Sequence, residues 1–514
     1  MATDRTATSS ASVQPAQPDT LDRAVIITGL VVVAGMIMAV LDTTIVNVAL
    51  DTLSRDLHAS LPTTQWVITG YLLALGVVIP LSGWATDTFG TKPVWITSLV
   101  LFTAGSALAG LSWSIESLIG FRVLQGLGGG MMLPVAQTII ARAAGPHRLG
   151  RAMSILGVPM LLGPVFGPVI GGLLVEKVSW HWIFFVNVPI GVLAVLLAAW
   201  KLPRGREESR GSKLDPLGLV LLAGGLTSLL YGLSEASSRG SFTQGRVLGW
   251  LTAGATCLAI FAVYSFVRQD AAVVNVRLFG NRLFSASSVL MLLVAVSLFG
   301  GMLLLPLYYQ IVRGQGALHA GLLMAPQGLG AMVAMPVAGR LTDRVGARRV
   351  VPFGLILVLA GTAVFTHVGT STSYTWLSLA LFVRGMGVGA SMMPTFAAAY
   401  ATLSRAMVSR AATTLSAIQQ VGGSFGSAVL VLVLTRRVAQ EFAGHGLSAH
   451  GSGAGQLTRL PAQLREMVAP LLALGFGYAF WVAIGLTAVA FLPAVLLPRH
   501  RAVPETPGAG PTAV

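Results

Sequence analysis

Charged residues are scarce in this chain. Only 10% of its 514 residues are Asp, Glu, Lys or Arg, whereas 54% are apolar, and the mean hydropathy is +0.78. Soluble proteins carry about 25% charged residues, so this chain has too few charges to cover the surface of a soluble domain. The same composition excludes disordered, collagen-like and coiled-coil proteins.

Cysteine and lysine are scarce as well, and each shortage excludes a kind of site. The single cysteine, Cys257, has no second thiol to pair with, which excludes a disulfide scaffold. None of the four lysines follows a glycine, so a Walker A phosphate loop is excluded and we expect no ATP site. The eight histidines show no metal-ligand spacing, so we expect no metal and no other cofactor.

Long apolar runs are what the chain has in abundance. A bilayer core of about 30 Å needs roughly 20 apolar residues per helix. The sequence contains fourteen runs of at least 17 residues, which predicts an all-α integral membrane protein with fourteen spans. The predicted spans start near residues 24, 62, 93, 116, 152, 182, 216, 246, 284, 321, 350, 374, 411 and 469.

The formal net charge of +15 indicates orientation in the membrane rather than binding of nucleic acid. The basic residues are scattered among short loops and form no contiguous face that nucleic acid would need. If both termini are cytoplasmic, the inner loops and tails hold 22 of the 33 Lys and Arg residues and the outer loops hold 9. The positive-inside rule favours that orientation. The preference for Arg over Lys, 29 to 4, favours a bacterial source, so we expect the cytoplasmic (inner) membrane of a bacterium.

An internal repeat divides the chain into two halves. The segment 83–92 recurs at 339–348 with the same spacing of Gly, Asp and Gly. We therefore expect a disordered cytoplasmic tail (1–23), an N-terminal six-helix bundle (24–200), a basic cytoplasmic linker with two extra transmembrane helices (201–283), a C-terminal six-helix bundle (284–498) and a cytoplasmic tail (499–514). Two parallel six-span repeats are typical of rocking secondary transporters, whose substrate site lies between them.

The repeated segment is interpreted as a short cytoplasmic loop that switches with conformation. Its acid can cap a helix or pair with a basic residue of a neighbouring loop, which would hold the cytoplasmic side closed in one state. The residues concerned are Gly83, Asp87, Gly90 and Lys92 in the first half and Gly339, Asp343, Gly346 and Arg348 in the second.

Asp42 is the most informative residue, because ionisable groups inside a bilayer mark ion paths or binding sites. It lies about 12 Å below the outer edge of its span, and Arg122 lies at about 9 Å in another span, so the two can meet. Such a pair can exchange a proton as solvent access changes. The alternative is a static buried salt bridge that fixes helix packing.

The fifth predicted span is rich in glycine and proline. Its glycines recur every four residues on one helix face, which permits close helix approach, and its prolines remove backbone donors. We interpret the run as a seam that seals or hinges the two halves. Its residues are Gly157, Pro159, Gly163, Pro164, Gly167, Pro168, Gly171 and Gly172.

Several polar and aromatic residues are candidates to line a central substrate cavity. Tryptophan and tyrosine near the ends of spans also form interface belts, which is the alternative for the aromatic members of the set. The candidates are Asn47, Gln65, Trp66, Tyr71, Gln125, Asn187, Tyr308, Tyr309 and Gln310.

These residues resemble the fourteen-span drug:proton antiporters of the major facilitator superfamily, the EmrB/QacA-like branch. The likeness rests on segments 41–50, 65–71, 83–92, 122–126, 157–172 and 180–189, with 305–310 and 325–327 in the second half. The resemblance implies alternating access, export of small amphipathic substrates driven by inward proton flow, Asp42 as the proton carrier and Arg122 as its partner. It also implies multidrug efflux and antibiotic resistance.

One deep carboxylate predicts one proton per substrate, so the exchange of a monovalent cation for a proton would be electroneutral. An alternative on the same scaffold is a dedicated exporter of an endogenous lipid, antibiotic or siderophore. An intramembrane enzyme is disfavoured, because it would need paired catalytic acids, metal ligands or a nucleophile with a base, whereas Asp42 stands alone in its span. The expected partners are substrates, protons and membrane lipids, and the sequence leaves the oligomeric state open, a monomer included.

Overall fold

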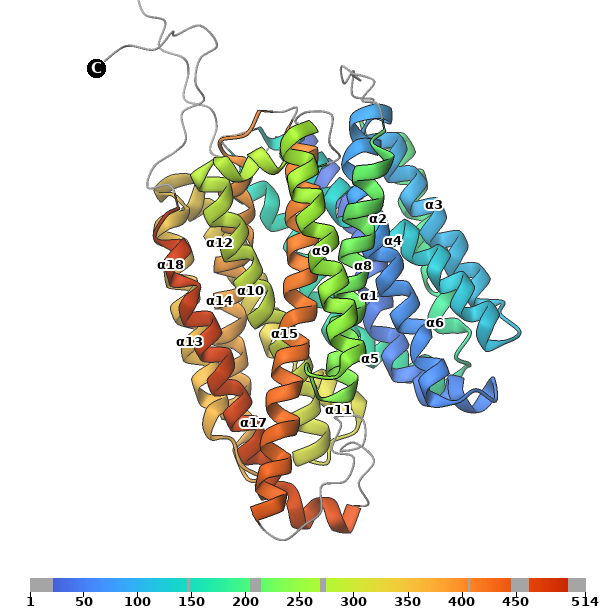
Figure 1. The fold of residues 1–514 in the computed structure, drawn as a ribbon, viewed down its shortest axis with the longest axis vertical. Coiled ribbons are helices and arrows are strands. Elements are labelled where there is room, and N and C mark those ends of the chain that lie inside the picture. The colour runs from blue at the N-terminus through green and yellow to red at the C-terminus, as the bar shows by residue number, and fades with distance from the viewer. Residues whose placement is uncertain are drawn as a thin grey trace, which may run out of the picture.

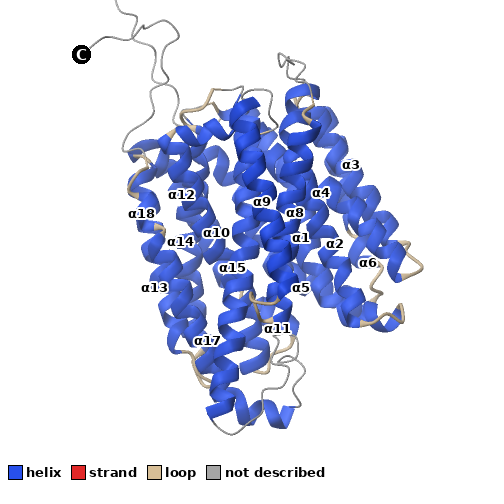
Figure 2. Cartoon of the chain, viewed as in Figure 1, coloured by secondary structure: helices blue, strands red, loops and turns tan. Residues whose placement is uncertain are grey.

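The computed structural model describes residues 22–145, 148–203, 214–268, 274–404, 407–444 and 462–497. Within these ranges every regular element is a helix (Figure 2). The first half contains α1 (Arg23–Asp56), α2 (Leu61–Phe89), α3 (Thr91–Gly110), α4 (Ile115–Ala144), α5 (Leu149–Lys177), α6 (Trp182–Phe185) and α7 (Asn187–Lys201). Two helices follow, α8 (Pro216–Arg239) and α9 (Gly245–Arg268). The second half contains α10 (Arg282–Leu307), α11 (Ala317–Leu323), α12 (Ala325–Val345), α13 (Ala347–Ala363), α14 (Tyr374–Tyr400), α15 (Val408–Gly444), α17 (Ala462–Val489) and α18 (Phe491–Ala494).

The lengths of these helices confirm the predicted fold class. In the described residues, 13 helical segments are long and apolar enough to cross a membrane. Outside that count, α5 is a further helix of 29 residues at the position of the fifth predicted span. Thirteen of the fourteen predicted starts lie within four residues of an observed helix start, and the last, residue 469, lies seven residues after the start of α17. Three spans are interrupted: α6 with α7, α11 with α12, and α17 with α18 each replace one continuous helix.

The helices form two bundles that lie side by side (Figure 1). In the first bundle α1 packs on α5, and α4 packs on α2 and α3. The second bundle repeats this arrangement, because α10 packs on α15, and α14 packs on α12 and α13. The bundles meet where α5 contacts α12 and where α2 contacts α15, so the contact surface is built from equivalent helices of the two halves.

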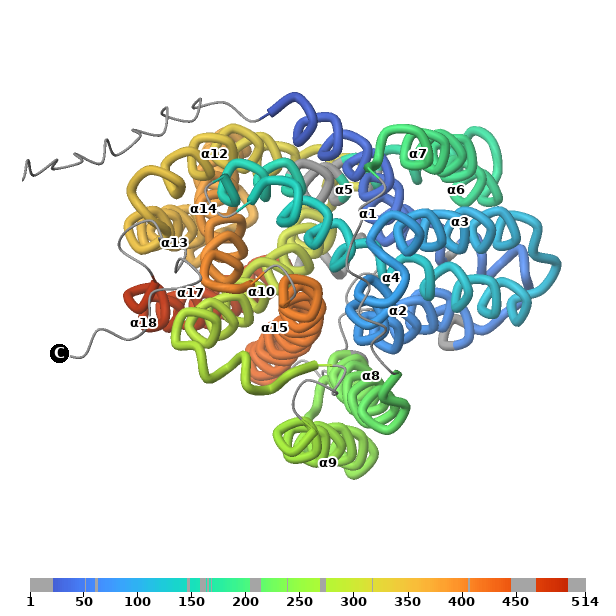
Figure 3. Tube along the Cα trace, turned by 90° about the horizontal axis from the view of Figure 1, so that it is seen from above, coloured from blue at the N-terminus to red at the C-terminus, as the bar shows by residue number. Residues whose placement is uncertain are grey.

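The two extra helices lie outside this junction. Viewed from above, α8 and α9 stand apart from both bundles, with α9 the more distant (Figure 3). Only α8 contacts the bundles extensively, and it contacts one helix of each, α2 and α15. An Asp215 side chain caps the first turn of α8 and accepts a hydrogen bond from Tyr264 of α9 at 2.6 Å, which ties the two extra helices together.

The structure corrects one expectation about the repeated segments. They were expected to be short loops, but Gly83 and Asp87 lie in the last two turns of α2, and only Gly90 separates α2 from α3. The second half is equivalent, with Asp343 in the last turn of α12 and Gly346 as the connection. A one-residue connection is feasible because both glycines have positive φ, 88° and 84°. The predicted tails and most of the basic linker lie outside the described residues.

Candidate functional site

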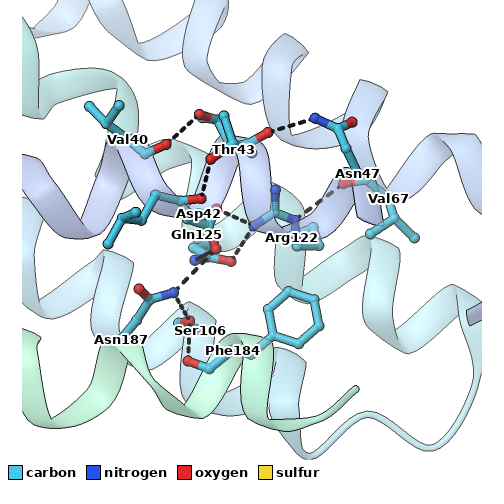
Figure 4. Close-up of polar contacts among 12 residues, drawn as sticks. Val40, Asp42, Thr43, Asn47, Val67, Ser106, Arg122, Gln125, Phe184 and Asn187 are labelled. Atoms are coloured by element: carbon cyan, nitrogen blue, oxygen red, sulfur yellow. Dashed lines mark hydrogen bonds and ion pairs between the residues drawn. The ribbon is translucent and has the colours of Figure 1, made fainter. Parts of the chain in front are cut away.

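Asp42 occupies a fully buried polar centre inside the first bundle (Figure 4). Its Oδ2 lies 2.5 Å from Nη1 of Arg122, which is a side chain of α4. Its Oδ1 accepts hydrogen bonds from the amides of Gln125 at 2.9 Å and Asn187 at 3.3 Å. Three donors from α4 and α7 therefore surround the carboxylate, and the one from Arg122 carries a positive charge.

Arg122 has several partners besides Asp42. Its Nη1 also donates to Oε1 of Gln125 at 2.7 Å, and its Nε donates to the carbonyl oxygen of Val67 at 3.2 Å. The guanidinium carbon lies 4.1 Å from the ring centroid of Tyr71, which is within cation–π range. Arg122 thus retains two hydrogen-bond acceptors and an aromatic face even when Asp42 carries no charge.

A chain of polar groups continues from Asn187 away from the carboxylate. The same amide nitrogen that faces Asp42 lies 3.1 Å from Oγ of Ser106, and this hydroxyl donates to the carbonyl oxygen of Phe184 at 2.9 Å. Phe184 is in α6 and Asn187 begins α7, so the break between these two short helices lies at the site. The free carbonyl released by the break serves as an acceptor, which an unbroken helix would not offer.

The other cavity candidates lie elsewhere. Trp66 was expected in the cavity, but its ring stacks on Tyr231 of α8 with centroids 5.9 Å apart, because the extra helices cover that face of α2. Tyr308 and Tyr309 are fully buried in an apolar cluster of the second bundle, where Tyr308 donates to the carbonyl oxygen of Gly369 at 2.8 Å. Three further candidates do not contact Asp42: Asn47 and Gln65 are exposed and Gln310 is half-buried. Of the nine candidates, Tyr71, Gln125 and Asn187 lie at the Asp42 centre.

The two bundles are joined at one end of the molecule by Asp343. Its Oδ1 accepts a hydrogen bond from the backbone N–H of Gly150 at 3.0 Å, and its Oδ2 accepts from the backbone N–H of Arg151 at 3.3 Å. Oδ2 also pairs with Nε of Arg151 at 3.0 Å. Gly150 and Arg151 belong to the first turn of α5, whose own N-cap residue, Arg148, provides no side-chain cap. An acid of the second half thus caps a helix of the first half.

Asp87 of the first half makes equivalent contacts with the start of a helix in the second half. It accepts a hydrogen bond from the Oγ of Ser409 and lies 3.5 Å from Nε of Arg410, both in the first turn of α15. Within the first half, Nη2 of Arg142 lies 3.4 Å from Oδ1 of Asp87. We call the end of the molecule that carries Asp87 and Asp343 the Asp87 end. The two acids close this end by bonding to the starts of α15 and α5.

Further contacts between the halves support this closure. Ser82 and Thr413 share a hydrogen bond of 3.1 Å between their hydroxyls, and Tyr400 donates to Oε1 of Gln137 at 3.0 Å. A Cβ on Gly83 would lie 2.8 Å from Oγ1 of Thr413. A Cβ on Gly339 would lie 2.7 Å from a backbone oxygen, the carbonyl of Gly150. The repeated glycines are therefore required for close approach of the halves.

The basic residues that end the repeated segments do not pair with these acids. Lys92 donates to the carbonyl oxygens of Ala199 and Leu202, both at 2.7 Å, and so binds the end of α7 in its own half. Arg348 is half-buried in the first turn of α13. The acids instead use Arg151 and Arg410, which occupy matching positions of the internal repeat but were not expected as their partners.

The glycines of α5 pack in a way that corrects the expected seam. A Cβ on Gly163, Gly167 or Gly171 would meet α1 of the same half. Only Gly157 faces the second half, against the side chain of Met335. A Cβ on Gly172 would meet nothing within 4 Å. The run is thus chiefly the packing surface between α5 and α1, and the side chains of Pro159, Pro164 and Pro168 lie outside the described residues.

Several residues at these sites were not predicted. Ser106, Ser409, Gln137 and Tyr400 are single polar residues in apolar helices, and nothing in their spacing identifies their partners. The contact of Asp343 with backbone N–H groups has no sequence signal, because the donors are present in every residue except proline.

Comparisons with known proteins agree with this architecture. A family model described as Major Facilitator Superfamily matches residues 32–429. The chain is 39% identical over 507 residues to a "Multidrug resistance protein B homolog" of Mycobacterium tuberculosis, covering 95% of this chain and 93% of that one. It is 32% identical to the "Multidrug export protein EmrB" of Haemophilus influenzae, covering 78% of this chain and 79% of that one. Among solved structures, the human organic anion transporter MFSD10 (TETRAN) has the same fold, with a TM-score of 0.59 at 15% identity over 91% of this chain and 99% of that one.

Proposed function

The chain belongs to the major facilitator superfamily and is a membrane transporter rather than an enzyme, and on that premise we propose that it exports small amphipathic molecules in exchange for protons. The family and its relatives named for multidrug resistance support export of drugs. The proposed cycle is alternating access, in which the two bundles rock about a central site and the Asp87 end opens and closes.

The observation that carries the proposal is the buried centre of Asp42. A carboxylate that is 0% exposed can take up a proton only if its cationic partner has somewhere else to bond. Arg122 has such alternatives, namely Oε1 of Gln125, the carbonyl oxygen of Val67 and the ring of Tyr71. Protonation of Asp42 can therefore release Arg122 without leaving it unbonded. We assign Asp42 as the proton carrier and Arg122 as the group whose position reports its protonation.

We propose a stoichiometry of one proton per substrate. Among the described residues, the buried acids are Asp42, Asp215 and Asp343. Asp215 caps the outlying helix α8, and Asp343 is at the Asp87 end, where it holds the bundles together. Only Asp42 lies in the middle of a span, which supports a single proton per cycle.

We also propose that the Asp87 end faces the cytoplasm, as the distribution of basic residues favours. Both α1 and α10 begin at this end, and the described residues Lys92, Arg142, Arg151 and Arg410 lie there. In this orientation the structure is the state closed to the cytoplasm. Loading of substrate from the cytoplasm then requires that Asp343 leave the start of α5 and that Asp87 leave the start of α15.

Proton release from acid-loaded proteoliposomes tests the proposal. The probe is ethidium, a lipophilic cation, added outside to the native protein and to Asp42→Asn. We expect ethidium to trigger proton release only from the native protein, because the amide cannot ionise. Asp215→Asn is the matched control, since an amide oxygen can still cap α8, and it should release protons normally.

The outcomes separate the candidate functions. Proton release by Asp42→Asn at the native rate would refute the role of Asp42. If the native protein binds ethidium without moving protons, exchange of amphipathic cations is refuted, and the dedicated exporter of a lipid, antibiotic or siderophore becomes the leading function.

A further inference from the structure

Arg384 is a second buried arginine, and the proton centre does not use it. It lies in α14 and is 2% exposed. Its Nη1 donates to Oε1 of Gln327 at 2.6 Å, and its Nη2 donates to the carbonyl oxygen of Ser297 at 3.2 Å. Nε is buried without a hydrogen-bond partner in the part of the chain that the structure describes. Both of its acceptors are uncharged.

The internal repeat shows which residue of the first half corresponds to Arg384. Gly126 in α4 packs on the backbone of Tyr71, and Gly385 in α14 packs on the backbone of Gln327. Aligning these two glycines places Arg384 in register with Gln125, the residue that follows Arg122 by three positions and donates to Asp42. Arg384 is thus the counterpart of a neutral amide, and not of Arg122 as residue type alone indicated.

The group that contacts Gln125 in the first half also differs from the group that contacts Arg384 in the second half. Asp42 of α1 contacts Gln125 and Asn187 of α7. In the second half Arg384 instead contacts the backbone of Ser297 in α10, whose carbonyl accepts from Arg384 and whose hydroxyl bonds to Thr487 of α17 at 2.7 Å. The first half therefore has an acid facing an amide, whereas the second half has a neutral backbone carbonyl facing a cation.

The shape of α10 is adapted to hold this cation. Gly301 lies directly against Nη2 of Arg384, and a Cβ at this position would overlap the guanidinium. A buried arginine without a counter-ion is costly inside a membrane, and such residues mark substrate or ion sites. Among the described residues no carboxylate forms an ion pair with Arg384, whose acceptors are the neutral oxygens of Gln327 and Ser297.

We propose that Arg384 binds the carboxylate of amphipathic substrates, which makes zwitterionic and acidic amphipathic molecules a transported class. The proposal rests on the proposed exporter function and specifies its substrates. The guanidinium offers a planar pair of donors that matches a carboxylate. Binding would exchange the neutral acceptors Gln327 and Ser297 for a charged one. A substrate in which the acid is esterified lacks this contact.

A pair of dyes that differ only in this group tests the proposal. Rhodamine 110 has a free carboxylate, and rhodamine 123 is its methyl ester. We would measure binding of each dye to the full-length protein in lipid nanodiscs by fluorescence anisotropy. The variants are Arg384→Gln, which removes the charge, and Arg384→Lys, which keeps it, with Arg239→Gln on the exposed face of α8 as the control.

We expect Arg384→Gln to weaken binding of rhodamine 110 about tenfold or more and to leave binding of rhodamine 123 unchanged, because a hydrogen-bonded charge is lost for one dye only. Arg384→Lys should lose less affinity than Arg384→Gln. The proposal is overturned if Arg384→Gln weakens both dyes equally, if neither affinity changes, or if the native protein binds only the ester. It is also overturned if tenfold more chloride alone displaces rhodamine 110, since a small inorganic anion would then be the ligand.

A second variant covers the case in which Arg384→Gln does not fold. Gly301→Ala keeps the arginine but displaces its guanidinium, so it should weaken rhodamine 110 selectively. Equal affinities of native and Gly301→Ala protein for both dyes would then count against the proposal. Failure here is distinct from failure of the exporter function, because proton release driven by ethidium depends on Asp42 and requires no carboxylate on the substrate.

Discussion

The strongest test of the buried centre is the stability of Arg122→Gln. This substitution removes the ion pair of 2.5 Å and leaves Asp42 with two amide donors, Gln125 at 2.9 Å and Asn187 at 3.3 Å. Removing one partner of a buried pair costs about 3–5 kcal/mol, because the other charge stays buried. The two remaining amides place the expected loss at the lower end, about 3 kcal/mol.

Removing both charges should restore most of that loss. Replacing a buried ion pair by neutral groups of similar size is often nearly neutral. We therefore expect the double variant Asp42→Asn with Arg122→Gln to lie within about 1 kcal/mol of the native protein. The coupling energy between the two sites would then be about 2 kcal/mol or more, which is in the range for residues in direct contact.

Equilibrium unfolding in mixed micelles at increasing SDS measures these free energies for the native protein, both single variants and the double variant. Arg239→Gln is the control, because its pair with Glu235 is partly exposed and should cost only about 0.2–1 kcal/mol. The reasoning fails if the losses of the two single variants simply add in the double variant, since the two side chains would then not depend on each other.

Three further predictions concern packing, closure and coupling. Gly167→Ala should destabilise the protein by about 1–3 kcal/mol, because its Cβ would overlap Thr44, whereas Gly172→Ala should be neutral; equal losses would contradict the packing of α5 on α1. Ser82→Cys combined with Thr413→Cys should form a disulfide that blocks transport until it is reduced, because the two hydroxyls lie 3.1 Å apart, and normal transport by the oxidised protein would refute closure at this end. Collapsing the voltage with valinomycin and potassium should leave export of a monovalent cation nearly unchanged, whereas collapsing the pH gradient with nigericin should stop it; a large loss with valinomycin would refute one proton per substrate.

The spans and their order were predictable because each is a long apolar run that the bilayer requires. Recognising two halves was also feasible, since the glycines of the repeated segments recur with fixed spacing. The close pair of Asp42 and Arg122 followed from their similar depth in two spans of the same bundle.

The sequence could not show which neighbouring helix packs against each helix face. Glycines four residues apart show that one face of α5 packs closely, but they do not say whether α1 or the second half lies against it. Trp66 is a residue type that can line a substrate cavity, and only the position of α8 shows that its ring stacks on Tyr231 instead. Arg384 is a buried arginine like Arg122, but the packing of the neighbouring glycines places it in register with Gln125.

The contact of Asp343 with α5 has a consequence for how the closed end responds to mutation and salt. The backbone N–H groups at the start of a helix carry part of the helix dipole, equivalent to about half a positive charge. Asp343 binds two of these groups as well as the Arg151 side chain, so its attraction to α5 does not depend on one basic residue. Buried pairs are screened little by salt. In the proposed cycle, opening of this end therefore requires the axis of α5 to turn away from Asp343, so that the position of a whole helix, rather than of one side chain, would set the state of the transporter.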